Sequence, residues 1–189
     1  MILYLIIIVG GGFSIAALVA FFAKKAFVSA LLFTWLAIAL IVALDAFIAT
    51  LSRLLPKKCA CPSRKIFAVS RKEKLFYEKL KIRKWKDKIP EIGHFTGFRK
   101  NKLIQPQSLA YIQRFLLENC YGEIGHFLSA VFGFLILLVR VWESWLLVAL
   151  PVAFVNAALN VLPLFVLRYN CYKLRVLQKN LQRKTARSA

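Results

Sequence analysis

The sequence predicts an all-α integral membrane protein with two transmembrane hairpins and a basic amphipathic segment between them. Three observations carry this prediction. Of the 189 residues, 60% are hydrophobic, whereas a typical soluble domain has about 45–50% apolar residues. The formal net charge is +20, and the basic residues gather in two stretches. The apolar stretches that remain are long enough for about four crossings of a bilayer.

The first hairpin is expected in residues 1–51. Residues 1–22 carry no charged side chain and precede Lys24-Lys25, so they predict a first span. We expect no cleaved signal peptide, because no basic n-region precedes this apolar run. Residues 26–51 predict a second span with one charge, Asp45. This carboxylate is either functional or paired with a lysine or arginine of the next segment, and we favour the pairing.

The basic segment follows in residues 52–122, with eighteen lysines and arginines against five acidic residues. The apolar periodicity of residues 71–89 predicts one amphipathic helix lying on the membrane surface. A second helix is expected from about residue 106 to Asn119. Anionic phospholipid head groups are the expected partners of this surface.

The second hairpin is expected in residues 123–167, followed by a basic cytoplasmic tail in residues 168–189. Its first span, residues 123–139, is short enough for the hairpin to be partly re-entrant. Trp142 and Trp145 suit the head-group level. The return span carries Asn156 and Asn160 on one helix face, where they either join helices or line a polar cavity. Pro163 is expected to free a backbone carbonyl near Asn160.

The distribution of charge predicts the topology and excludes some classes of partner. The positive-inside rule places the basic segment and the tail on the cytoplasmic side of a bacterial-type cell membrane. Nucleic acid is not expected, because there is no zinc-finger spacing, RNA-binding sheet signature or basic heptad region. The four cysteines lack a CxxC spacing and are expected to be free thiols. The oligomeric state stays open.

The most informative pair is Glu123 and His126, which lie three residues apart at the start of the third span. They share a helix face, where the carboxylate would orient the imidazole as a base. Alternatively, they are a helix-start carboxylate and an interfacial histidine without a chemical role. The topology brings Asn160 and Arg168 to the same membrane level. We therefore assign these four residues to catalysis, with His126 as general base and the amide or Arg168 stabilising an oxyanion.

Such a set suits transfer of an acyl group from a cytoplasmic donor to a lipid hydroxyl. The donor is expected to be acyl-CoA or an acyl-carrier protein, with its phosphates held by lysines, and no bound cofactor or metal is expected. A non-enzymatic lipid-binding or assembly scaffold is the alternative. A metal site of Glu123, His126 and His94 is a weaker one, because the chain has only two histidines.

Three sequence motifs carry a family resemblance. In chain order they are Arg83-Lys84-Trp85-Lys86-Asp87-Lys88-Ile89-Pro90, then Glu118 with Glu123-x-x-His126, then Asn160 with Arg168-Tyr169-Asn170. Over roughly residues 75–180 the chain resembles the glycosyl-diaponeurosporenoate acyltransferase family, which completes staphyloxanthin-type carotenoid lipids. The resemblance implies esterification of a sugar hydroxyl on a membrane glycolipid. The expected substrate-binding residues are Arg83, Lys84, Trp85, Lys86, Lys88, Glu118, Asn156, Tyr169 and Asn170.

Overall fold

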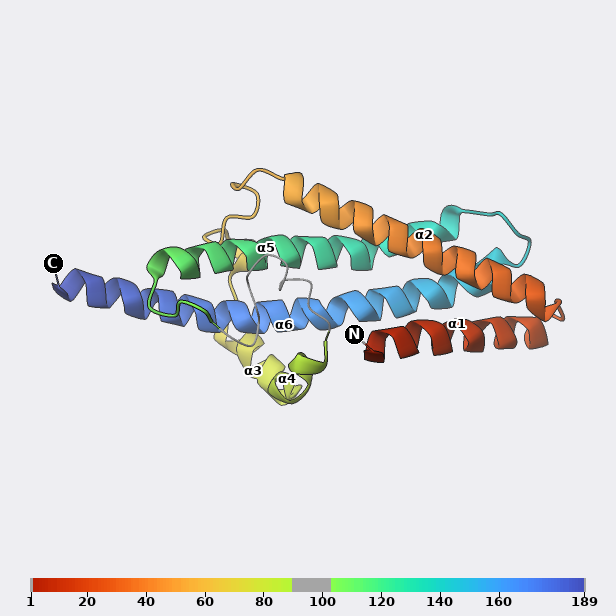
Figure 1. Ribbon diagram of the computed structural model, residues 1–189, viewed down its shortest axis with the longest axis horizontal. Coiled ribbons are helices and arrows are strands. Elements are labelled where there is room, and N and C mark those ends of the chain that lie inside the picture. Colours follow the sequence, from red (N-terminus) through yellow and green to blue (C-terminus); the bar gives the residue numbers. More distant parts are fainter. Residues whose placement is uncertain (1, 90–102, 189) are drawn as a thin grey trace. The chain divides into compact units, whose positions relative to one another are not determined.

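The computed structural model describes residues 2–89 and 103–188, and every regular element within these ranges is helical (Figure 1). The all-α prediction is therefore confirmed for the described part of the chain. His94 lies outside the described residues. The chain forms two compact units. The first unit combines Met1–Leu51 with Gly125–Leu162, and the second combines Ser52–Ile124 with Pro163–Ala189.

The first hairpin consists of α1, Ile2–Phe22, and α2, Phe27–Leu54. Both helices lie close to the predicted spans because two long apolar runs, the second with Asp45 as its one charge up to Leu51, flank a short charged turn. The core of the first unit is rich in small side chains, which allow membrane helices to approach one another closely. Its fully buried alanines are Ala16, Ala30, Ala37, Ala149 and Ala153.

The second turn of the first unit has a different structure from the one expected. A 3-10 helix, η4, spans Gly133–Leu138, and α6 begins at Trp145. The Trp145 side chain is only 1% exposed, and its indole N–H donates to the Ile136 carbonyl at 2.8 Å. Trp145 is therefore packed inside the first unit instead of facing lipid head groups, and its expected depth in the membrane stays a prediction. Lys25 pairs with Glu143, so the two turns lie together, as two hairpins require.

The basic segment of the second unit folds as short helices: η1, Lys65–Phe67, α3, Arg71–Lys79, α4, Ile82–Trp85, and η2, Lys86–Lys88. Ser70 caps α3 by accepting the Glu73 amide N–H at 3.1 Å. The single helix expected over residues 71–89 is broken at Lys81, whose φ is +53°. A residue with left-handed backbone geometry cannot continue an α-helix, so the chain changes direction between α3 and α4.

Two long helices continue through the boundaries that the sequence predicts. Helix α5 runs without a break over Leu109–Phe132, and α6 covers the 44 residues Trp145–Ser188. Pro163 lies inside α6 and cannot donate to the Leu159 carbonyl one turn earlier. In the first unit that carbonyl accepts the Tyr4 hydroxyl at 3.1 Å. The freed carbonyl that the sequence predicts near Asn160 therefore has a partner.

The chain is a multi-pass membrane protein by the length and composition of its helices. Within residues 2–89 and 103–188, four helices are long and apolar enough to cross a bilayer: Tyr4–Phe22, Phe27–Leu54, Leu109–Leu138 and Trp145–Arg187.

Candidate functional site

The first unit holds a group of polar side chains that we call the membrane cluster: Asp45, His126, Asn156 and Asn160. Asn160 is its centre. The Asn160 Nδ2 donates to Asp45 Oδ2 at 3.0 Å, and its Oδ1 lies 2.9 Å from His126 Nδ1. The Asn156 Nδ2 lies 3.4 Å from both Asp45 Oδ1 and the Ser129 carbonyl. Helices α2, α5 and α6 each contribute to the cluster.

The chain of hydrogen bonds fixes the tautomer of His126. A carboxylate accepts hydrogen bonds, so Asp45 draws the amide nitrogen of Asn160 toward itself. The carbonyl oxygen of Asn160 then faces His126, and an oxygen can only accept. His126 Nδ1 must therefore carry the proton, which leaves the lone pair on Nε2. A neutral imidazole with a free Nε2 lone pair can act as a general base.

The two asparagines of the membrane cluster are buried in the first unit. Asn156 is 7% exposed and Asn160 is 8% exposed. Within the described ranges, no buried side-chain nitrogen or oxygen lacks a hydrogen-bond partner. A Cβ atom added at Gly133 would lie 2.6 Å from Asn156 Nδ2. Any side chain at this glycine would therefore displace the amide from the cluster.

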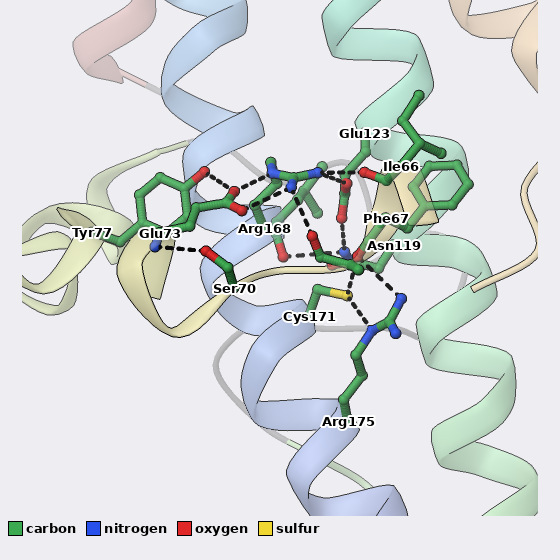
Figure 2. Close-up of polar contacts among 12 residues, drawn as sticks. Ile66, Phe67, Ser70, Glu73, Tyr77, Asn119, Glu123, Arg168, Cys171 and Arg175 are labelled. Atoms are coloured by element: carbon green, nitrogen blue, oxygen red, sulfur yellow. Dashed lines mark hydrogen bonds and ion pairs between the residues drawn. The ribbon is translucent and has the colours of Figure 1, made fainter. Parts of the chain in front are cut away.

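The second unit holds a separate group, the arginine cluster of Glu73, Asn119, Glu123 and Arg168, which Figure 2 shows with its neighbours. Glu123 is 3% exposed, and each of its oxygens has a partner. Asn119 Nδ2 donates to Oε1 at 2.8 Å, and Arg168 Nη1 donates to Oε2 at 3.0 Å. Asn119 also donates to the Leu167 carbonyl at 3.1 Å, which ties α5 to α6 in this unit.

All five N–H groups of Arg168 are engaged. Nε and Nη2 donate to the two oxygens of Glu73 at 2.5 and 3.0 Å, which is a bidentate ion pair. Besides Glu123, the remaining acceptors are the carbonyls of Ile66 at 3.2 Å and Ala68 at 3.4 Å. In this arrangement the guanidinium joins two carboxylates and a backbone segment, and no N–H remains for another acceptor.

Glu73 also accepts the Tyr77 hydroxyl at 2.6 Å. Burial alone would raise the pKa of Glu73, but the hydrogen bonds from Arg168 and Tyr77 outweigh it and hold this pKa below its usual range. Burial and the same carboxylate raise the pKa of Tyr77. The Tyr77 ring packs against Phe165, with centroids 5.5 Å apart, so α3 is held to α6 by packing as well as by charge.

The lowered pKa of Glu73 makes the stability of the protein depend on pH. A carboxylate with a lowered folded-state pKa stabilises fully above its unfolded pKa, about 4.3, and loses that contribution as the pH falls through the folded value. The difference in thermal stability between wild type and Glu73→Gln in detergent should be constant above about pH 5 and shrink below about pH 4. A difference that does not change between neutral and acidic pH would contradict this assignment.

The structure pairs Glu123 and His126 with different partners. They lie three residues apart on α5, as the spacing requires, but both oxygens of Glu123 bond to Asn119 and Arg168. His126 Nδ1 faces Asn160 instead. The orienting group of the imidazole is thus an amide with Asp45 behind it, rather than the carboxylate of Glu123. Asp45 in turn bonds to asparagines and not to the lysine or arginine that the sequence favours.

The expected substrate-binding residues lie in three settings. Arg83 and Lys84 on α4 and Lys88 in η2 are exposed, while Trp85 and Lys86 are half-buried. Trp85 donates to the Leu80 carbonyl at 2.9 Å, and Lys86 lies 3.6 Å from Asp87.

Asn156 belongs to the membrane cluster of the first unit, and the others are part of the second unit's packing. Glu118 pairs with Arg53 and with Arg114, the latter at 3.7 Å. Tyr169 is 1% exposed, and the Lys173 ammonium lies 4.5 Å from its ring centroid. Asn170 is half-buried.

Four residues that form or adjoin the two clusters escape sequence reasoning or receive no definite role from it. Glu73 has a local signal, the Ser70-x-x-Glu73 capping box, which suggests a helix start but not its pairing with Arg168. Asn119 lies four residues before Glu123, the spacing of neighbours on a helix face. Gly133 has no sequence signal of its own. Asp45 is a candidate for function or for ion pairing from the sequence, which does not predict its asparagine partners.

Among the residues described, no three histidine, cysteine or acidic side chains gather as metal ligands. His94, which the metal alternative requires, lies outside those ranges.

Comparison with known proteins identifies the family of this chain. A family model described as glycosyl-4,4'-diaponeurosporenoate acyltransferase matches residues 63–180, well over half of the chain. The chain has no detectable similarity to a curated protein or to a solved structure. The matched residues include the whole arginine cluster and all of the membrane cluster except Asp45.

Proposed function

Since this chain belongs to the glycosyl-4,4'-diaponeurosporenoate acyltransferase family, it is an acyltransferase of carotenoid biosynthesis, and we propose that it esterifies a hydroxyl of a membrane glycolipid with a fatty acyl chain. The observation that carries this proposal is the hydrogen-bonded series from Asp45 through Asn160 to His126. It leaves His126 with a basic Nε2 inside an apolar unit. Proton transfer from an alcohol is the chemistry that such a base performs.

The reaction begins when His126 Nε2 takes the proton of the sugar hydroxyl. The hydroxyl oxygen attacks the carbonyl carbon of an acyl thioester, and a tetrahedral intermediate forms. Collapse of this intermediate breaks the carbon–sulfur bond and leaves the new ester on the glycolipid. The departing thiolate takes the proton back from His126, so the enzyme returns to its starting state.

Asp45 and Asn160 act as positioning residues for the base. They hold the imidazole with Nδ1–H toward the amide throughout the cycle, and the amide oxygen stabilises the imidazolium that forms. The amide of Asn156 is the candidate donor to the developing oxyanion. Both contacts of its Nδ2 are long, at 3.4 Å, so a stronger acceptor would compete for this donor.

Arg168 is better suited to structure than to catalysis, because its five donors are already engaged. We assign the binding of the donor's phosphates, whether of acyl-CoA or of an acyl-carrier protein, to the exposed Arg83, Lys84 and Lys88. These residues and the basic tail would face the cytoplasm, where the donor is made, and would contact anionic head groups.

The test is a lipid comparison by mass spectrometry in a host that makes carotenoid glycosides and other glycolipids. Cells with the wild-type protein should contain a glycolipid heavier by one fatty acyl unit than any in cells without it. The mass of that lipid names the acceptor. If the protein inserts and the glycolipids are present but no acylated form accumulates, the proposed activity is wrong.

A further inference from the structure

The first unit contains a narrow groove, which we call the acyl groove, lined by α1, α2 and α6. Its walls are apolar or glycine except for one residue, Asn156. Gly11 lines it from α1, Ile38 from α2 and Val152 from α6. We infer that this groove holds the fatty acyl chain of the substrate, and this inference rests on the proposed function.

The lining of the groove selects the occupant. The groove is open rather than enclosed, with a volume of about 60 Å³, and its lining carries one polar side chain, Asn156. An apolar methylene chain suits such a lining, whereas a sugar head group would bring several hydroxyls to walls that offer them one polar partner. Because surrounding lipid is as apolar as the walls, the groove gains little from hydrophobicity. It can act by close packing and by fixing where the chain ends.

The one polar residue that lines the groove belongs to the membrane cluster. Asn156 forms part of the wall, and Asn160 donates to its side-chain oxygen at 3.1 Å. Leu159, between them, also lines the groove, and the Tyr4 hydroxyl on its carbonyl fixes the start of α1 there. A chain lying in the groove therefore brings its carbonyl to the Asn156 amide, beside the residue that orients His126.

The glycines of α1 keep the groove open. Gly10-Gly11-Gly12 removes side chains from one stretch of α1, and in membrane helices such small residues allow close approach of neighbouring groups. A Cβ at Gly12 would lie 3.1 Å from Ile38 Cδ1, so here α1 meets α2 closely. A Cβ at Gly11 or Gly10 would meet nothing within 4 Å. Only Gly11 of these two lines the groove, so a side chain at Gly11 would enter it and one at Gly10 would not.

This difference supplies a matched pair of variants. Gly11→Val and Gly11→Phe fill the groove in two steps, and Gly10→Phe adds the same bulk one residue away. The first readout is the acyl-chain mass of the product lipid. The second uses purified protein in vesicles of neutral phospholipid with a photoreactive diazirine fatty acid as the probe. Mass spectrometry then maps labelled peptides that contain Ile38 or Val152.

Gly11→Val should shift the product toward shorter acyl chains, and Gly11→Phe should extend the shift and abolish labelling of those peptides. Gly10→Phe should match wild type in both readouts. Wild-type labelling and chain lengths in both Gly11 variants would overturn the inference, as would equal effects of Gly10→Phe. If Gly11→Phe fails to accumulate, Gly11→Val decides.

The two readouts also separate the groove from the reaction. If the groove is labelled but no acylated product forms, the groove binds an acyl chain and the proposed acyl transfer is wrong. If acylated product forms but the groove is not labelled, the acyl transfer is correct and the acyl chain binds elsewhere.

Discussion

Replacing His126 with alanine is expected to lower the rate of acyl transfer by about 10²–10⁴-fold, the range that general base catalysis contributes. The reason is the position of its ring in the hydrogen-bonded series. Nδ1 faces the Asn160 carbonyl oxygen at 2.9 Å, so the reactive lone pair is on Nε2. Alanine removes that lone pair and leaves the helix intact. The measurement is product formation per inserted protein, by mass spectrometry of the acylated lipid.

Two companion variants sharpen this result. Phe127→Ala changes the next residue on α5, which is 56% exposed, and should keep wild-type activity. Asn160→Leu keeps the base but removes its orienting oxygen, so its rate should fall by less than that of His126→Ala. A His126→Ala protein as active as the Phe127→Ala control would show that another group takes the proton.

Replacing Arg168 with leucine is expected to destabilise the protein by about 3–5 kcal/mol, the cost of leaving a buried carboxylate without its partner. Glu123 is 3% exposed and would keep only Asn119, and Glu73 would lose both of its bidentate contacts. Leucine restores none of the five hydrogen bonds. The measurement is the midpoint of thermal unfolding in detergent, monitored by circular dichroism.

The controls use the same helix and the same cluster. Arg183→Leu removes an exposed arginine of α6 and should change the midpoint little, because surface charges contribute about 0–1 kcal/mol. Adding Glu123→Gln to Arg168→Leu removes the unpaired charge and should recover part of the loss. An unchanged midpoint in Arg168→Leu would mean that the two glutamates do not depend on this guanidinium.

The hydrophobic pattern predicts the membrane helices well and their ends poorly. Helices α1 and α2 match the expected spans because long apolar runs with at most one intramembrane charge favour the bilayer, where a helix satisfies their backbone groups. Helices α5 and α6 continue through Gly122 and Pro163 because packing and a hydrogen bond from elsewhere offset the local preference against helix. The sequence predicts a single helix over residues 71–89, but Lys81 adopts a left-handed conformation and breaks it. No glycine or proline lies at this position, so the pattern gives no signal of the break.

The sequence predicts which residues belong to the candidate site better than it predicts which of them bond to one another. His126 and Asn160 were placed together by topology, and the structure joins them. The partners of Asp45 and Glu73 lie about a hundred residues away along the chain, on other helices. Such contacts depend on how each helix is rotated, and a periodic pattern defines a face without defining what that face meets.

Asp45 gives the enzyme a bipartite character. The Asp45 carboxylate, which fixes the tautomer of His126 through Asn160, comes from the first hairpin. This hairpin lies outside residues 63–180, which the family model matches. In a bilayer, helical hairpins insert as separate pieces and then associate, so under the proposed mechanism the contact from Asp45 toward His126 is acquired only at the second of these stages. Newly inserted protein would therefore lack the full orientation of its base until the two hairpins associate. Under this mechanism, full activity follows helix association inside the membrane and not insertion alone.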